Sequence, residues 1–437
     1  MKRILFPYFL WMLMSIESIA QSLYFPPTSG TTWSTLAPES LNWCQSRIDS
    51  LYKYLDDNNT KAFIILKDGK IVLEKYFGTH TVTTPWQWAS AGKTITAFMV
   101  GIAQQENKLS ISDKTSKYLG QGWTSCTPQQ EDMITIWNQL TMTSGLDDNV
   151  PDHFCTLKSC LLYKADAGTR WAYHNGPYTL LDSVMEIATN TTLNNYTTVK
   201  LKNPTGMTGQ FFKVGYNNVF FSTARSMARF GLLMLNKGNW NGTPVMTDMT
   251  YFNQMINTSQ NINKSYGYLW WLNGKPSHML PSSQLVFNGS MCPNAPADMY
   301  AGMGKDGQFV NVVPSQNLVW VRMGGTPDEL AVPYLLNDKI WSYVNQLNCN
   351  ITAIQPADPA EISFHTYPNP VLENVFIKSE KIISKVEIYS IMGQRIMAYD
   401  VLAKSCVLPV NELKAGQYII KAGLQGGRYL VAKFIKQ

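Results

Sequence analysis

The sequence predicts an α+β fold for the larger, N-terminal part of the chain, followed by a small all-β sandwich. Three observations lead to this prediction. A helical pattern and a β-hairpin open the larger part, while two strands and a helix close it, so both ends can contribute to one sheet. Most of the segment between them has helical patterns separated by loops. After residue 364, only short strands with alternating apolar residues follow.

Residues 1–20 form a segment of their own ahead of the predicted domains. Lys2 and Arg3 precede an apolar run at 4–16, and small residues at 18 and 20 are typical of a cleavage site. This pattern predicts a secretory signal peptide, and the run is short for a membrane anchor, which is the alternative interpretation. We therefore expect an exported protein with no integral membrane segment after signal cleavage.

Residues 21–349 carry the predicted α+β domain. Apolar residues recur at helical spacing in its first helix, and Asp68-Gly69 is a favourable turn between two strands. Near its end, two more strands are followed by apolar residues spaced i, i+4, i+7 and i+11, which predict a helix. These elements are expected at residues 41–51 (helix), 62–66 and 70–77 (hairpin), 309–313 and 318–323 (strands) and 336–347 (helix).

The composition changes twice after this domain. Residues 350–363 contain two prolines and several small residues, which indicates a linker. Residues 364–437 then have the alternating pattern of a small β-sandwich. Its strands are expected at residues 375–379, 385–391, 395–401, 417–422 and 428–435.

Composition and charge exclude some classes of protein. With 45% hydrophobic and 15% charged residues, the chain is globular rather than disordered. The net charge is +6, and most of the excess lies beyond residue 364, where lysines alternate with apolar residues as on the solvent face of strands. The larger domain has no basic patch, so nucleic acid is not an expected partner.

Six of the seven cysteines lie before residue 350. An exported protein can form disulfides, but the sequence does not choose among the possible pairings. Cys155 and Cys160 are near enough to close a small loop, and Cys44 and Cys349 lie by the first and last predicted helices. Buried free thiols are the alternative for several of the cysteines.

Ser90 and Lys93 form a candidate catalytic pair. They stand one turn apart at the start of a segment whose apolar residues follow helical spacing, so both side chains share one face. A serine hydroxyl becomes a nucleophile when an adjacent base takes its proton, and a desolvated lysine can be that base. The spacing alone is weak evidence, because Ser50 and Lys53 share it. That second pair is expected on the solvated face of the first helix.

Two later segments offer the further groups that such a catalyst needs. Tyr173 has a phenol that can relay protons if nearby ammonium groups lower its pKa, and Asn175 can hydrogen-bond both a lysine and a substrate amide. Lys305 offers positive charge, and Gly307 lets backbone N–H groups approach an oxyanion. An ordinary Asp-Gly hairpin turn is the alternative interpretation of this last segment.

In this order, Ser-x-x-Lys at 90–93, Tyr-x-Asn at 173–175 and Lys-x-Gly at 305–307 resemble the three active-site motifs of serine hydrolases related to class C β-lactamases. That family also includes D-Ala-D-Ala carboxypeptidases, esterases and 6-aminohexanoate-dimer hydrolases. Three flanking segments are similar as well: residues 134–146, 221–231 and 266–271. The resemblance covers roughly residues 30–348. It implies a β-lactamase/transpeptidase-like antiparallel sheet flanked by helices, with a helical subdomain.

The resemblance implies a role for each motif residue. The implied nucleophile, base and proton relay are Ser90, Lys93 and Tyr173. The implied substrate and oxyanion residues are Asn175, Lys305, Gly307 and Gln308, with the backbone N–H groups of Ser90 and Gln308 forming the oxyanion hole. No metal or other cofactor is implied, and the five histidines lack the spacing of metal ligands.

Two positions depart from the family pattern. Asp306 stands where β-lactamases and carboxypeptidases have Thr or Ser, which helps to hold a substrate carboxylate. A carboxylate there would repel an anionic substrate or pair with Lys305, so we expect an uncharged substrate rather than an antibiotic. Met142 stands where the family commonly has His, and we expect only a change in the scaffold. Five tryptophans line either an aromatic cleft or the core: Trp86, Trp88, Trp171, Trp270 and Trp271.

The C-terminal part resembles a different family. Tyr-Pro-Asn-Pro at 367–370, together with residues 386–394 and 413–418, is similar to the type IX secretion C-terminal sorting domain of Bacteroidetes. This resemblance spans residues 364–437. It implies transit through the periplasm, passage across the outer membrane and release or display at the cell surface. A generic β-sandwich binding module is the alternative.

The sequence thus predicts an exported serine hydrolase that cleaves a small ester or amide through an acyl-enzyme on Ser90. A D-Ala-D-Ala peptidase or a β-lactamase is the alternative within the same family. A non-catalytic protein that binds a peptide or peptidoglycan on the same scaffold is the alternative from another class. The expected partners are a small ester, amide or peptide substrate and the type IX secretion machinery.

Overall fold

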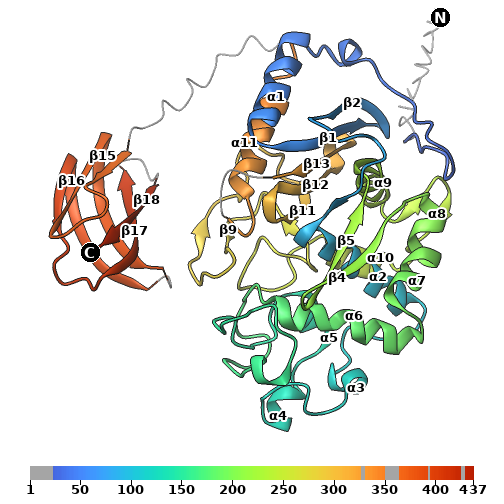
Figure 1. The fold of residues 1–437 in the computed structure, drawn as a ribbon, viewed down its shortest axis with the longest axis horizontal. Helices are drawn as coiled ribbons and strands as arrows, with labels where there is room; N and C mark the ends of the chain where they lie inside the picture. Colours follow the sequence, from blue (N-terminus) through green and yellow to red (C-terminus); the bar gives the residue numbers. More distant parts are fainter. Residues whose placement is uncertain (1–22, 326–329, 350–363, 392–393, 425–428) are drawn as a thin grey trace, which may run out of the picture.

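The computed structural model describes residues 23–325, 330–349, 364–391, 394–424 and 429–437 (Figure 1). The predicted signal peptide at 1–20 and linker at 350–363 lie outside the described residues. Among the helices that are described, none has the length and apolar character that crossing a bilayer requires.

A six-stranded antiparallel sheet forms the centre of the larger domain, in the order β2-β1-β13-β12-β11-β8. The N-terminal hairpin and the last strands of the domain are therefore neighbours, which confirms the predicted assembly of one sheet from both ends. Apolar residues on both faces of β1 and β13 are buried, as expected for a sheet that is covered on two sides. The strands are β1 (Thr60–Lys67), β2 (Lys70–Tyr76), β8 (Trp271–Leu272), β11 (Tyr300–Gly304), β12 (Gln308–Val313) and β13 (Leu318–Gly324).

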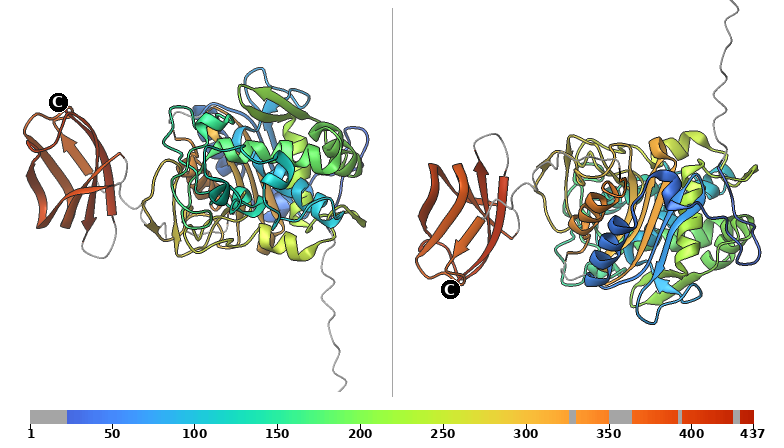
Figure 2. Two further views of the ribbon diagram at one scale, coloured as in Figure 1. Left: turned by 90° about the horizontal axis from the view of Figure 1, so that it is seen from below. Right: turned by 90° about the horizontal axis from the view of Figure 1, so that it is seen from above.

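Helices cover both faces of this sheet. The first and last helices of the domain, α1 (Gln45–Asp57) and α11 (Tyr334–Val344), lie side by side on one face (Figures 1 and 2). On the other face, α9 (Ala224–Leu235) packs against β1, β12 and β13. Gly231 allows this close packing, because a Cβ there would lie 2.5 Å from Cγ1 of Val319.

The remaining helices form the predicted helical subdomain, together with a small three-stranded sheet in the order β3-β5-β4. Its helices are α2 (Lys93–Gln105), α3 (Ser116–Leu119), α4 (Pro128–Glu131), α5 (Ile136–Leu140), α6 (Asn175–Thr189), α7 (Leu193–Thr197), α8 (Asn203–Thr205) and α10 (Met249–Met255). The strands are β3 (Trp86–Gln87), β4 (Gln210–Val214) and β5 (Asn217–Ser222). Short hairpins are formed by β6 (Asn239–Trp240) with β7 (Thr243–Pro244) and by β9 (Ser277–His278) with β10 (Phe287–Asn288).

Single turns of helix complete the domain. The 3₁₀-helices are η1 (Pro38–Leu41), η2 (Ala89–Gly92), η3 (Lys158–Cys160), η5 (Lys305–Gly307) and η6 (Pro314–Gln316), and η4 (Thr198–Lys202) is a π-helix.

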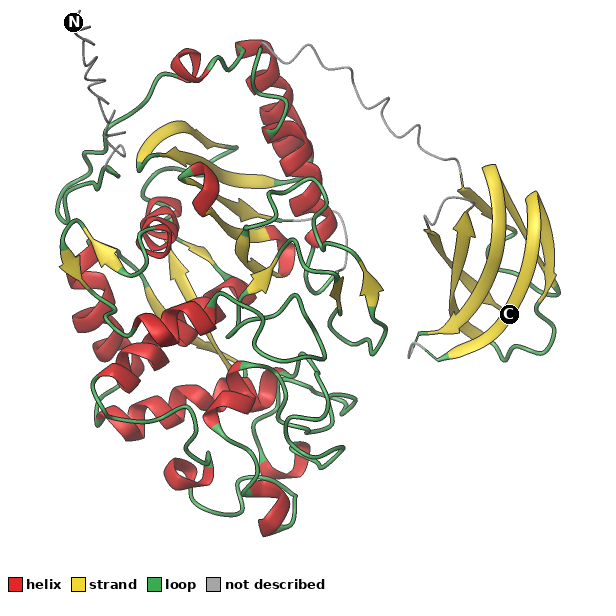
Figure 3. Ribbon diagram, turned by 180° about the vertical axis from the view of Figure 1, so that it is seen from behind, coloured by secondary structure: helices red, strands yellow, loops and turns green. Residues whose placement is uncertain are grey.

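Strands and loops make up the described part of the C-terminal domain, which has an apolar core of its own (Figure 3). Four strands follow the order β14-β15-β17-β18, and β16 pairs with β15. They are β14 (Phe364–Tyr367), β15 (Asn374–Ser390), β16 (Arg395–Pro409), β17 (Gly416–Leu424) and β18 (Tyr429–Lys436). The strands predicted at 375–379 and 385–391 are wrong as separate elements, because a register shift between Lys378 and Lys385 lets β15 continue through the irregularity.

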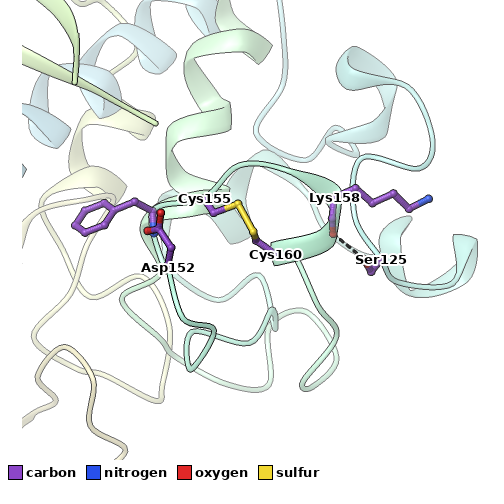
Figure 4. Close-up of a disulfide and its surroundings, with 6 residues drawn as sticks. Ser125, Asp152, Cys155, Lys158 and Cys160 are labelled. Atoms are coloured by element: carbon purple, nitrogen blue, oxygen red, sulfur yellow. Dashed lines mark hydrogen bonds between the residues drawn. A yellow bond between two sulfur atoms is a disulfide. The ribbon is translucent and has the colours of Figure 1, made fainter. Parts of the chain in front are cut away.

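Two disulfides settle the pairings that the sequence left open. Cys44 is bonded to Cys349, with 5.2 Å between their Cα atoms, and this bond ties the start of α1 to the chain after α11. Cys155 is bonded to Cys160 and closes a short loop (Figure 4). A hydrogen bond of 2.6 Å from Ser125 Oγ to the carbonyl of Lys158 anchors that loop to the neighbouring segment.

We predict that replacing both Cys44 and Cys349 with serine lowers the free energy of unfolding by about 2–5 kcal/mol, because the bond closes a very long loop in the unfolded chain. Urea denaturation of the variant and of the unaltered chain measures the difference. Cys126→Ser is the control, since Cys126 is a partly buried free thiol. Equal denaturation midpoints for the double variant and the unaltered chain would contradict the prediction.

Candidate active site

Ser90 lies in the 3₁₀-turn η2, between the short strand β3 and helix α2. The preceding residue, Ala89, has a φ of +44°, which is a strained value for a residue with a side chain. Trp88 holds this turn from behind. Its buried indole donates to Ser222 Oγ (2.8 Å), and its backbone N–H donates to the carbonyl of Phe220 (2.8 Å). The half-buried Ser90 side chain is therefore presented by a rigid, strained turn.

Lys93 begins helix α2, one turn after Ser90. Its Nζ lies 2.9 Å from Ser90 Oγ, within hydrogen-bond distance. The side chain is 5% exposed, and Nζ lies 4.3 Å from the ring centroid of Tyr178 and 5.2 Å from that of Tyr173. Burial lowers the pKa of Lys93 to about 7, against an opposing effect of the Asp182 carboxylate. A large share of the Lys93 side chains is therefore neutral near pH 7 and able to accept a proton.

The second pair with this spacing has none of these properties. Ser50 Oγ donates to the carbonyl of Ser46 in its own helix (2.9 Å), and Lys53 forms an exposed ion pair with Asp57 (3.0 Å). Sequence spacing is the same in both pairs, so burial is what distinguishes Lys93 from Lys53.

Tyr173 lies in the segment before α6 and is hydrogen-bonded to the side chain of Ser90. Its ring is buried and stacks on Trp271, with 5.7 Å between the centroids. Burial raises the pKa of Tyr173 above its ordinary value, although the hydrogen bond with Ser90 acts in the opposite direction. This differs from the expectation that ammonium groups lower this pKa. The phenol therefore keeps its proton at neutral pH and can donate it.

The backbone at Met142 fixes the segment that carries Tyr173. Met142 has a φ of +58°, and its carbonyl accepts a hydrogen bond from the N–H of Ala172 (2.9 Å). The residue that departs from the family pattern thus contributes to the site through its backbone.

Asn175 is the first residue of α6, and its side chain is 4% exposed. Its Oδ1 is buried and has no hydrogen-bond partner among the described residues. The next residue, Gly176, donates its N–H to the carbonyl of His153 (2.9 Å), and a Cβ on Gly176 would lie 2.4 Å from the carbonyl oxygen of Cys155. The disulfide loop therefore packs against the start of α6 and supports the position of Asn175.

The segment predicted as the third motif forms the turn between β11 and β12. Lys305 is exposed on this turn. Gly307 has a φ of +75°, and a Cβ there would lie 2.1 Å from Nη1 of Arg322, so this glycine is required by the turn and by the arginine. The Gln308 side chain is fully buried and exchanges two hydrogen bonds with the backbone of Gly324 (2.6 and 3.0 Å). These side chains build the hairpin. The substrate role expected for Lys305 and the oxyanion role expected for the backbone N–H of Gln308 stay predictions.

The residue of this hairpin that packs against Ser90 is Gly304, at the end of β11. A Cβ on Gly304 would lie 2.9 Å from the backbone nitrogen of Ser90, 2.8 Å from that of Ala91 and 2.5 Å from the carbonyl oxygen of Trp88. Only a glycine allows β11 to approach the turn this closely. The sequence reasoning missed Gly304, and its only signal was the Gly-x-Gly spacing with Gly302.

The tryptophans mostly belong to the core rather than to an open cleft. Trp86 is half-buried. The other four are no more than 2% exposed: Trp88, Trp171, Trp270 and Trp271. They hold the motifs in place, as the stacking of Tyr173 on Trp271 illustrates. Within the described residues, no group of three or more His, Cys, Asp or Glu side chains could hold a metal ion.

Comparisons with known proteins agree with this architecture. Residues 53–337 match the family model described as Beta-lactamase, and residues 365–437 match the model described as Secretion system C-terminal sorting domain. The first match covers more than half of the chain, so the chain belongs to the β-lactamase family. The C-terminal domain is of the sorting type, which implies handling by the type IX secretion machinery. No curated protein matches the chain.

Solved structures with little sequence identity share the fold. The penicillin-binding protein of Bacillus halodurans has 17% identity and a TM-score of 0.51, with 68% of this chain and 99% of that chain covered. A family VIII carboxylesterase has 12% identity and a TM-score of 0.53, with 69% and 96% covered. An octameric penicillin-binding protein homologue of Pyrococcus abyssi has 14% identity and a TM-score of 0.54, with 90% and 96% covered. The fold is therefore that of β-lactamase-related hydrolases.

We predict that Gly304→Ala lowers the rate of covalent labelling of Ser90 by a fluorophosphonate roughly a hundredfold, because the added methyl group displaces β11 from the Ser90 backbone. Intact mass spectrometry over time measures this rate, and thermal unfolding checks that the variant folds. Gly325→Ala is the matched control, since its Cβ would lie 3.4 Å from Cβ and 4.0 Å from the carbonyl oxygen of Asn59, which leaves room for a methyl group. A folded Gly304→Ala variant that is labelled as fast as the unaltered chain would contradict the role of Gly304.

Proposed function

We propose that the protein is an exported serine hydrolase that cleaves an uncharged ester or amide through an acyl-enzyme on Ser90. The observation that carries the proposal is the contact of 2.9 Å between Ser90 Oγ and a buried lysine whose pKa is lowered to about 7. A neutral amine at this distance can take the serine proton. The C-terminal sorting domain supports an enzyme that acts outside the inner membrane, at the cell surface or in the medium.

Acylation involves three proton transfers. Lys93 Nζ takes the proton of Ser90 as Oγ forms a bond to the substrate carbonyl carbon. The backbone N–H groups of Ser90 and Gln308 stabilise the resulting oxyanion. Gly304 supports this arrangement, because it lets the end of β11 approach the backbone of Ser90. Tyr173 gives its proton to the leaving oxygen or nitrogen, receives the proton held on Lys93, and the carbon–leaving-group bond breaks. Asn175 orients Lys93 and the substrate through its unpartnered Oδ1 and its amide.

Deacylation reverses these proton transfers with water in place of the leaving group. Tyr173 passes its proton to Lys93 as it takes one from the attacking water, whose oxygen bonds to the acyl carbon. The bond from Ser90 Oγ to the acyl carbon then breaks, and Oγ takes a proton from Lys93. Because the raised pKa of Tyr173 keeps its phenol protonated, Lys93 is the base in both half-reactions and Tyr173 is the relay.

The surroundings of Ser90 favour an uncharged acyl group. The end of β11 that adjoins Ser90 is Gly302-Met303-Gly304, which carries no charge, and Lys305 is exposed on the turn beyond it. A substrate carboxylate gains stability from a cation held close to it. The likeness to a family VIII carboxylesterase agrees with ester cleavage. The alternatives are a D-Ala-D-Ala peptidase or a β-lactamase, and a non-catalytic protein that binds peptides.

We predict that Ser90→Ala and Lys93→Met each lower the hydrolysis of p-nitrophenyl butyrate by the purified chain at least about a thousandfold, since the first removes the nucleophile and the second removes its base. Ser50→Ala is the matched control, because Ser50 has the same Ser-x-x-Lys spacing on an exposed helix face and should leave the rate unchanged. Faster cleavage of a D-Ala-D-Ala peptide or a penicillin would favour the alternatives in the family. Retained hydrolysis in Ser90→Ala, or none of these substrates being cleaved by the unaltered chain, would reject the proposed mechanism.

We also predict that kcat/KM rises with pH through a midpoint of about 7 and stays level above it. Below this pH, Lys93 holds its own proton and cannot take that of Ser90; above it, the amine is free. A pH–rate profile with a neutral ester between pH 5 and 9 measures the midpoint. A midpoint near 10, the ordinary value for lysine, would show that burial does not lower the pKa of Lys93.

A further inference from the structure

The carboxylate of Asp182 is buried where α6 packs against α2, and the proposed mechanism gives it no role. It lies on α6 and is 4% exposed. Its Oδ2 accepts a hydrogen bond from Nδ2 of Asn218 on β5 (2.9 Å). Its Oδ1 is buried and has no hydrogen-bond partner among the described residues. A half-satisfied carboxylate in the interior costs free energy, so its position calls for a function.

Asp182 lies on the face of α6 that packs against α2, the helix that Lys93 begins. Tyr178 and Asp182 are four residues apart, so they are neighbours on one face of the helix. Lys93 Nζ lies 4.3 Å from the ring centroid of Tyr178, and the Tyr178 hydroxyl lies 3.3 Å from Thr96 Oγ1 one turn along α2. The face of α6 that carries Asp182 therefore packs on the face of α2 that carries Lys93. The carboxylate acts electrostatically on the Lys93 amine at this interface.

We propose that Asp182 is a positioning residue that stabilises the ammonium formed on Lys93 when Ser90 attacks the substrate. The inference rests on the proposed function and adds a charged group to the Ser90–Lys93 pair. As Oγ bonds to the carbonyl carbon, the O–H bond of Ser90 breaks and an N–H bond forms on Lys93. Asp182 takes no proton in this step. Its negative charge faces the new positive charge in an environment where water screens neither.

Among the described residues, few other charges act at this interface. Glu186 lies one turn further along α6 and raises the pKa of Asp182, while Asn218 and Lys93 lower it; burial is the largest effect, and the pKa is raised to about 7. Burial lowers the pKa of His153 in the loop before the disulfide, and the charge of Lys93 acts in the same direction. Tyr173 and Tyr178 stay neutral, because burial raises the pKa of both. Above about pH 7, the carboxylate of Asp182 is thus the negative charge available to Lys93.

The test is the pH dependence of Ser90 labelling by a fluorophosphonate, followed by intact mass spectrometry on the full chain. Asp182→Asn keeps the shape of the side chain and removes its charge. We expect the midpoint of the acidic limb to fall by about one pH unit, because Lys93 then loses its proton more easily. We also expect the plateau above the limb to fall roughly threefold, since the base is weaker. Glu186→Gln is the matched control: it removes an exposed negative charge from the same helix and should shift the midpoint much less.

Further variants separate an electrostatic role from a structural one. Asp182→Glu should restore the midpoint in part. Asn218→Ala should move the midpoint in the same direction as Asp182→Asn but less far, because Asp182 then stays protonated to higher pH. If Asp182→Asn does not fold, the midpoint measured for Asn218→Ala tests the inference instead. A lower plateau with an unchanged midpoint in a folded Asp182→Asn variant overturns the inference, as does an unchanged midpoint in Asn218→Ala. Failure of the unaltered chain to be labelled at Ser90 would instead overturn the proposed function.

Discussion

The burial of one lysine is the constraint on which the site depends. A lowering of the Lys93 pKa from 10.5 to about 7 corresponds to on the order of 5 kcal/mol of cost for the charged form. That is a large fraction of the net stability of a typical domain. The surrounding structure must therefore hold the amine in a dry position at the expense of stability. The result is a base of suitable strength in contact with the serine hydroxyl.

The fold keeps this arrangement rigid from several directions. The strained turn at Ala89 is held by Trp88 and by the approach of β11 at Gly304. The start of α6 is supported by the loop that the bond between Cys155 and Cys160 closes. The bond between Cys44 and Cys349 joins the two ends of the domain, which supply the neighbouring strands of the central sheet. Elements that are far apart in sequence thus meet around a single side-chain contact.

Local patterns in the sequence were enough for the larger features of the fold. The hairpin around Asp68-Gly69 and the closing helix follow from alternation and helical spacing, and the sheet from their positions at both ends. The contact between Ser90 and Lys93 follows from their position on consecutive turns of helix. The Ser-x-x-Lys spacing does not predict whether the lysine is buried. Lys93 and Lys53 differ only in what packs over them, and that depends on residues far away in the sequence.

The remaining parts of the site depend on tertiary contacts. Lys305 and Gly307 match a short sequence pattern, and their substrate and oxyanion roles stay predictions. The exposure of Lys305 and the close packing of Gly304 on Ser90 depend on how the hairpin docks, which the pattern does not contain. Asp182 gave no signal in the sequence, since an acidic residue on a helix is usually on its solvated face. Likewise, β15 was predicted as two strands, because a bulge interrupts the alternation without ending the strand.

We propose that Ser90 carries the acyl group during turnover. The most direct measurement is rapid chemical quench of the full chain with p-nitrophenyl butyrate, followed by intact mass spectrometry and peptide mapping. We expect a burst of p-nitrophenol close to one equivalent and a butyryl adduct on the peptide that contains Ser90, with Lys93 unmodified. Turnover without any adduct, or an adduct that forms at the same rate on another residue, would contradict it.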